Sequence, residues 1–81
     1  MAEATRRERD VLVALLEYPH EHEGKHPSLS EIASVLELTK AGAQRHVSAL
    51  QLKGKAELRP GGGWSVTKSG RAELKRHGLI T

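Results

Sequence analysis

The stretch from Ser28 to Leu58, SLSEIASVLELTKAGAQRHVSALQLKGKAEL, decides the fold of this chain of 81 residues. It predicts two short amphipathic helices joined by a tight turn and followed by a β-strand. Ser28 and Glu31 form a capping box for the first helix, and Thr39 is a good N-cap for the second. Such a pair of helices is typical of the motif that places its second helix in the major groove of DNA.

The apolar residues of these two helices fall on one side of each. Ile32, Ala33 and Leu36 form the inner face of the first helix, and Leu38 in the turn points inward. In the second helix, around residues 40–53, the predicted buried stripe consists of Ala43, Val47 and Leu50.

An N-terminal helix precedes this motif. Thr5 and Glu8 form its capping box, and apolar residues recur at helical spacing up to Tyr18. We expect the helix to end at Pro19, because proline disfavours helical backbone at the residue before it. A polar loop, HEHEGKHP, then leads to the central stretch.

A hairpin and a last helix follow. Gly54 is the expected C′ glycine of the second motif helix. Residues 56–59 and 64–66 alternate between apolar and polar side chains, which predicts two half-buried strands around the turn PGGG at residues 60–63. Thr67 caps a final helix from Lys68 to about His77, which Gly78 ends.

This order, α-α-α-β-β-α, predicts an α+β fold that is mostly α. We expect a winged helix-turn-helix: a three-helix core, a two-stranded β wing around residues 56–66 and a short C-terminal helix. No linker, repeat or low-complexity segment divides residues 1–81, so we expect one domain.

Composition narrows the function classes. The chain has no cysteine, which excludes disulfides and thiolate metal sites and fits a reducing compartment. No apolar run approaches the roughly 18 residues that span a bilayer, and the N-terminus lacks a secretory apolar stretch. We therefore expect a cytoplasmic protein, nucleoid-associated when bound to DNA, with no membrane partner.

The charge is unevenly distributed along the chain. Residues 1–39 carry four Lys/Arg and eight Asp/Glu, a net of −4, whereas residues 40–81 carry nine and two, a net of +7. A localised basic surface is expected for a polyanion partner, although a solvated lysine-rich surface would give the same count.

The central stretch of the chain resembles the helix-turn-helix of the bacterial winged-helix repressors. The pattern consists of Glu31, Ile32, Ala33, Leu36, Leu38, Thr39, Leu50 and Gly54. The tail WSVTKSGRAEL resembles the wing exit of multiple-antibiotic-resistance-type regulators at Val66, Thr67, Gly70 and Arg71. The N-terminal half resembles the DNA-binding domain of LexA-type SOS repressors, including His46, Ala49 and Leu50. The resemblance spans roughly residues 5–76 and implies a DNA-binding regulator.

The chain departs from these families at several positions. Glu37 stands where the turn usually has glycine, so a left-handed residue there would be strained or absent. Gly42 lies near the start of the reading helix, where glycine costs about 1 kcal/mol relative to alanine. Lys55 replaces the usual apolar residue after Gly54, and the wing is short. No peptidase sequence follows in these residues, so we expect no LexA-type self-cleavage.

The face of the reading helix opposite its buried stripe supplies the predicted site. Gln can pair with adenine and Arg with guanine, so we expect Gln44 and Arg45 to read bases. The resemblance implies that Thr39, Ala41 and Gly42 also approach the DNA bases or backbone. Gly42 could equally be a glycine that the helix tolerates without a role in binding. The predicted phosphate contacts are Lys40, Ser48, Lys53 and Lys55, and Arg59 at the wing base is expected at a minor groove or a flanking phosphate.

The scarcity of aromatic residues favours duplex DNA over single-stranded DNA as the partner. Trp64 is the only tryptophan, and we expect it to pack under the wing rather than to stack on a base. With one Tyr and no Phe, the chain lacks the series of aromatics that single-strand binders use. His46 beside the buried stripe is expected to pack or to contact a phosphate.

Two motifs suggest other chemistry. His22 to His26 matches HExxH, which binds zinc only on a helix, but Gly24 interrupts it and Pro19 and Pro27 bracket it. An adventitious metal site from His20, His22 and His26 is more credible than a zinc peptidase, and the alternative is a plain solvated loop between helices. The glycines of the PGGG segment lack the GK[ST] of a phosphate-binding loop. With no nucleophile–base pair, we expect no enzyme, no cofactor and no metal.

We therefore predict a sequence-specific regulator of double-stranded DNA, with a repressor favoured. It would read the major groove with the helix around residues 40–53 and flanking backbone or minor groove with the wing. A homodimer through Leu79, Ile80 and the outer side of the first helix is a further expectation, since palindromic operators pair with two-fold dimers. The alternative is a winged-helix protein-interaction module without DNA binding.

Overall fold

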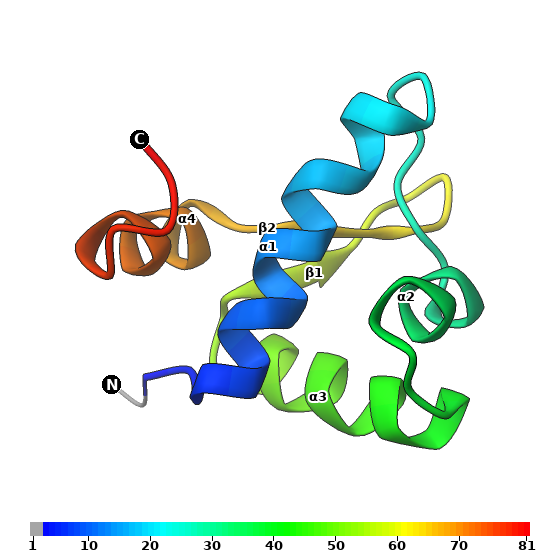
Figure 1. Ribbon diagram of the computed structural model, residues 1–81, viewed down its shortest axis with the longest axis horizontal. Coiled ribbons are helices and arrows are strands. Elements are labelled where there is room, and N and C mark those ends of the chain that lie inside the picture. Colours follow the sequence, from blue (N-terminus) through cyan, green and yellow to red (C-terminus); the bar gives the residue numbers. More distant parts are fainter. Residues whose placement is uncertain (1–2) are drawn as a thin grey trace.

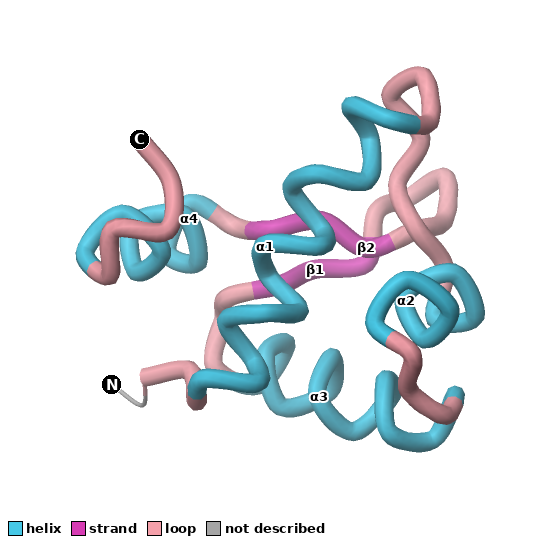
Figure 2. The backbone as a smooth tube through the Cα atoms, viewed as in Figure 1, coloured by secondary structure: helices cyan, strands magenta, loops and turns pink. Residues whose placement is uncertain are grey.

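A computed structural model describes residues 3–81 of the chain (Figure 1). Its elements follow the predicted order α-α-α-β-β-α, so the winged helix-turn-helix is confirmed. Figure 2 shows the two strands crossing behind α1, with α4 on one side of that helix and α2 on the other. The elements are α1 (Arg6–Glu21), α2 (Leu29–Leu36), α3 (Lys40–Leu52), β1 (Ala56–Leu58), β2 (Trp64–Val66) and α4 (Lys68–Arg76).

α1 begins as predicted and ends later than predicted. The Thr5 hydroxyl accepts the N–H of Glu8 at 3.1 Å, and the Glu8 carboxylate accepts the N–H of Thr5 at 2.9 Å. The helix does not end at Pro19 but continues to Glu21. A proline in the last turn lacks only one hydrogen-bond donor, and the Pro19 carbonyl accepts the N–H of Gly24 at 2.8 Å.

The turn between α2 and α3 contains the left-handed residue that the sequence placed in doubt. Glu37 adopts φ 55° and ψ 43°, a conformation that glycine occupies at lower energy. Its N–H and that of Leu38 donate to the carbonyls of Ser34 and Ala33, at 3.3 and 2.8 Å. These bonds satisfy the carbonyls left free at the end of α2 and turn the chain into α3.

The wing is a two-stranded antiparallel hairpin in which Ala56 pairs with Val66 and Leu58 with Trp64. Ala56 is buried as predicted, but Leu58 is 56% exposed because the strand leaves the core at its tip. Ser65, predicted to point outward, is buried. Trp64 is half-buried against the core. Its backbone N–H donates to the carbonyl of Pro27 at 2.9 Å, which ties the wing to the loop before α2.

α4 is capped by Thr67, whose hydroxyl accepts the N–H of Gly70 at 3.2 Å and donates to the carbonyl of Gly54 at 2.6 Å. Gly70 packs so closely that a Cβ there would lie 2.5 Å from the carbonyl oxygen of Lys55. The helix ends before Gly78, which takes φ +70° as expected of a C′ glycine.

The core lies where α1 crosses the other elements. α1 contacts α2, α3, β2 and α4, and its inward residues join the stripes predicted for α2 and α3. Within residues 3–81, no helix has both the length and the apolar character that crossing a membrane requires. The largest fully buried apolar side chains are Leu12, Leu15, Ile32, Leu50, Leu74, Val11 and Val47.

Candidate nucleic-acid interface

α3 has one face in the core and the other in solvent. Its buried residues are Ala43, Val47 and Leu50, each at most 1% exposed, which confirms the predicted stripe. The remainder of the helix therefore points away from α1 and α2. The exposed residues of the predicted reading surface are Thr39, Lys40, Ala41, Gln44, Arg45 and Ser48.

The start of α3 is held by a cap between Thr39 and Gly42. The Thr39 hydroxyl accepts the N–H of Gly42 at 3.0 Å, which satisfies one of the free donors at the helix N-terminus. A Cβ on Gly42 would lie 3.2 Å from that hydroxyl oxygen, a tight contact. Gly42 thus leaves room for the cap at the end of the helix that carries Gln44 and Arg45.

The wing and the start of α2 lie beside the first residue of α3. A groove runs between them, and its lining includes Lys40, the exposed Leu58 and Trp64. Ser28 and Ser30, exposed at the start of α2, line the same groove. The start of α2, the first residue of α3 and the wing therefore meet at one groove beside the outer face of α3.

The comparison with protein families gives this surface its context. The sequence pattern of the LexA DNA-binding domain matches residues 1–63, more than half of the chain. The chain belongs to the LexA DNA-binding domain family. No curated protein matches it. The family is one of DNA-binding winged-helix regulators, and the match ends at the wing, so β2 and α4 of this LexA-type domain lie beyond it.

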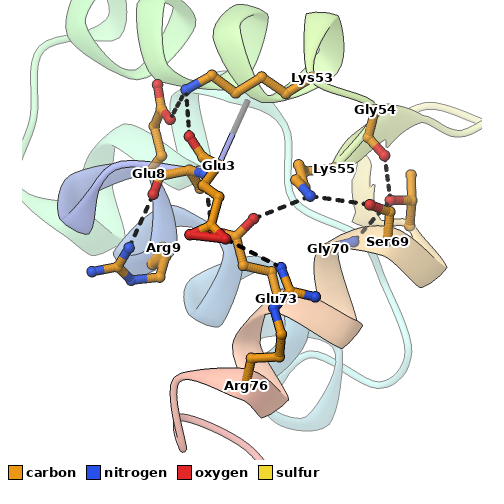
Figure 3. Close-up of polar contacts among 12 residues, drawn as sticks. Glu3, Glu8, Arg9, Lys53, Gly54, Lys55, Ser69, Gly70, Glu73 and Arg76 are labelled. Atoms are coloured by element: carbon orange, nitrogen blue, oxygen red, sulfur yellow. Dashed lines mark hydrogen bonds and ion pairs between the residues drawn. The ribbon is translucent and has the colours of Figure 1, made fainter. Parts of the chain in front are cut away.

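Two of the predicted phosphate contacts are engaged inside the LexA-type domain. The Lys53 ammonium lies 2.6 Å from the Glu8 carboxylate and donates to the carbonyl of Glu3 at 3.1 Å (Figure 3). Burial alone would raise the pKa of Glu8, but the hydrogen bonds from Lys53 and Thr5 hold it below its usual value. Lys53 therefore joins the end of α3 to the start of α1.

The prediction for Lys55 was wrong. Its side chain is 3% exposed and its ammonium lies 3.1 Å from the carboxylate of Glu73, which is fully buried (Figure 3). The same ammonium donates to the Ser69 hydroxyl, and Glu73 accepts the N–H of Ala4 at 2.9 Å. Burial would raise the pKa of Glu73, but these partners lower it. A lysine enclosed this way cannot reach a phosphate.

Three of the predicted cations remain exposed at the candidate interface: Lys40 and Arg45 on α3, and Arg59 on the wing. Among residues 3–81, none of the three forms an ion pair with an acid. The backbone N–H of Arg59 donates to the carbonyl of Gly63 at 2.8 Å, which closes the wing turn and fixes where the Arg59 side chain leaves the strand.

The histidine loop lacks the geometry of a metal site. His22 caps α1 and the following Glu23 and Gly24 take φ 57° and 81°, so HExxH is not helical. The residues that do bring three potential ligand atoms together, among those described, are Glu3, Glu73 and His77. There one Glu73 carboxylate oxygen accepts the Ala4 N–H and the other lies 3.1 Å from the Lys55 ammonium.

Sequence reasoning missed Ser28, Ser30 and Leu58 as members of the site. Ser28 is a capping residue whose side chain is also exposed beside Lys40. Strand alternation predicts Leu58 on the same side as the buried Ala56, but its side chain is exposed. Their common feature is proximity across the α2–wing groove, which depends on how the hairpin folds back and is not encoded locally.

Proposed function

We propose that this LexA-type domain is a sequence-specific, double-stranded-DNA-binding transcriptional repressor. It would act in the cytoplasm, on nucleoid DNA, as a homodimer on a two-fold operator. The observation that carries the proposal is the outer face of α3, which is polar, exposed and free of acidic residues from Lys40 to Ser48. Membership of a DNA-binding family supports it and weighs against an interaction module without DNA binding.

Within this proposal the outer residues divide into two roles. Gln44 and Arg45 read base edges in the major groove, because their side chains can form bidentate hydrogen bonds with adenine and guanine. Thr39, Lys40, Ala41 and Gly42 lie at the start of α3 and contact phosphates or adjacent bases, and Ser48, further along the same face, contacts a phosphate. Lys53 follows the end of α3 and would contact a phosphate only by giving up its ion pair with Glu8. The wing, through Arg59, reaches a minor groove or a flanking phosphate.

Selection of bound sequences from a random duplex pool tests the proposal. The wild-type chain should recover one motif with two-fold symmetry. Arg45→Ala should weaken binding to that motif by about 10–100-fold and relax the preference at one base pair per half-site. Arg45→Lys keeps the charge but loses the bidentate fork, so it should lose preference while keeping the salt dependence.

The salt dependence separates the two candidate functions. Binding through phosphates makes the logarithm of the association constant fall by roughly 0.9 per neutralised phosphate for each unit of log salt concentration. A pool that yields no motif, or an Arg45→Ala chain that recovers the same motif with equal affinity, would contradict base reading by α3. A shallow salt slope would favour the interaction module.

A further inference from the structure

The outer side of α1 carries an acidic rim along an apolar groove. Asp10, Glu17 and Glu21 are spaced by seven and four residues, so they lie on one helix face, and all three are exposed. The groove beside them encloses about 450 Å³. Its apolar lining includes Val35, 53% exposed, and Leu79, 47% exposed. Two such residues in one groove form an apolar surface that water covers in the isolated chain.

The outer side of α4 carries the opposite charge. Lys68, Arg71 and Lys75 follow one another at intervals of three and four residues, and Arg76 flanks them. All four are exposed, whereas Gly70, Glu73 and Leu74 face the core. Within residues 3–81 only Arg76 of the four forms an ion pair, with Glu3 at 3.6 Å. None of the three rim acids of α1 forms one. Both charged faces are therefore available to a partner.

The two faces are neighbours. α1 and α4 pack against each other, and Leu79, just beyond the end of α4, lines the groove on α1. No residue of α3 lines this groove or belongs to the α4 stripe. A partner on this surface would leave the reading face of α3 uncovered.

We propose that this surface binds a second copy of the chain, with the cationic stripe of each α4 against the acidic rim of the other copy's α1. Because rim and stripe are adjacent, one two-fold axis near Leu79 can satisfy both contacts at once. Packing α1 directly on α1 would instead bring Asp10, Glu17 and Glu21 against the same acids, which repel. The exposed Val35 and Leu79 supply the apolar centre that such interfaces contain.

This inference deepens the homodimer part of the proposed function, and it is tested without DNA. Sedimentation velocity over a concentration series should show a weak monomer–dimer equilibrium for the wild-type chain. Glu17→Lys and Lys75→Glu should each weaken dimerisation by about tenfold, because the symmetry repeats each altered contact. Glu57→Lys, on the exposed side of β1, and Lys25→Glu, in the loop after α1, are matched controls that should leave it unchanged.

Charge-swap rescue makes the test specific. An equimolar mixture of the Glu17→Lys and Lys75→Glu chains restores opposite charges at both contacts and should dimerise as the wild type does. A single chain with both substitutions should do the same, which also shows that the variants fold. A monomeric wild type, an assembly larger than a dimer, or a mixture without rescue would overturn the inference. DNA selection by a monomeric chain would leave DNA binding standing while the dimer surface falls.

Discussion

Replacing Glu73 by glutamine should destabilise the domain strongly. The substitution keeps the shape and an acceptor for the Ala4 N–H, but it removes the only acid within 4.0 Å of the Lys55 ammonium among residues 3–81. Removing one partner of a buried ion pair costs about 3–5 kcal/mol. We take the lower end, about 3 kcal/mol, because Lys55 keeps its hydrogen bond to Ser69. A domain of this size has only about 3–5 kcal/mol in total.

Urea denaturation followed by the fluorescence of the single Trp64 measures this loss, and thermal denaturation should show Tm lower by roughly 12–24 °C. Glu57→Gln, an exposed acid on β1, is the control and should change stability by less than about 0.5 kcal/mol. Lys55→Met combined with Glu73→Leu removes both charges and should recover most of the loss. If Glu73→Gln unfolds at the wild-type urea concentration, the ion pair does not stabilise the packing of α4.

Two further predictions concern acid unfolding and close packing. Glu8 and Glu73 have lowered pKa values in the folded chain, so the stability that they contribute is complete above the unfolded pKa of 4.5 and is lost as pH falls through the folded pKa values. An acid titration followed by circular dichroism should therefore show a shallower decline of stability below pH 4.5 for Glu8→Gln than for the wild type, and an unchanged slope would refute the assignment. Gly70→Ala should lose about 2 kcal/mol, because its Cβ would meet the Lys55 carbonyl oxygen at 2.5 Å and a Val66 methyl at 2.7 Å; Gly61→Ala, where nothing lies within 4 Å, should be nearly neutral in the same urea titration.

The sequence predicted the elements because their ends are marked by local chemistry. The capping residues Thr5, Ser28, Thr39 and Thr67 all form their predicted bonds, since a cap joins a side-chain hydroxyl to a backbone N–H only three residues away. Pro19 failed as an end signal because a proline in the last turn disrupts only one bond. Local rules also could not tell that Glu37 would take the left-handed conformation, since two hydrogen bonds to α2 compensate there.

The candidate site was predictable where it depends on one helix and not where it depends on several. Burial of Ala43, Val47 and Leu50 followed from helical spacing, and the exposure of Gln44 and Arg45 followed from that stripe. The positions of lysines relative to other elements did not follow. Lys53 meets Glu8 across 45 residues of sequence, and no pattern in the chain indicates that pairing.

Lys55 shows why α4 belongs with the winged core although the family match ends before it. A lysine after Gly54, where repressors of this fold usually have an apolar residue, would leave an ammonium beside the base of the wing. Glu73 from α4 neutralises this ammonium, and the Thr67 hydroxyl donates a hydrogen bond to the adjacent Gly54 carbonyl at 2.6 Å. Gly70 allows the approach, since any larger residue would meet the Lys55 backbone. Lys55, Gly70 and Glu73 therefore act as one unit, so changing any one of them alone should loosen α4 and with it the cationic stripe on its outer face.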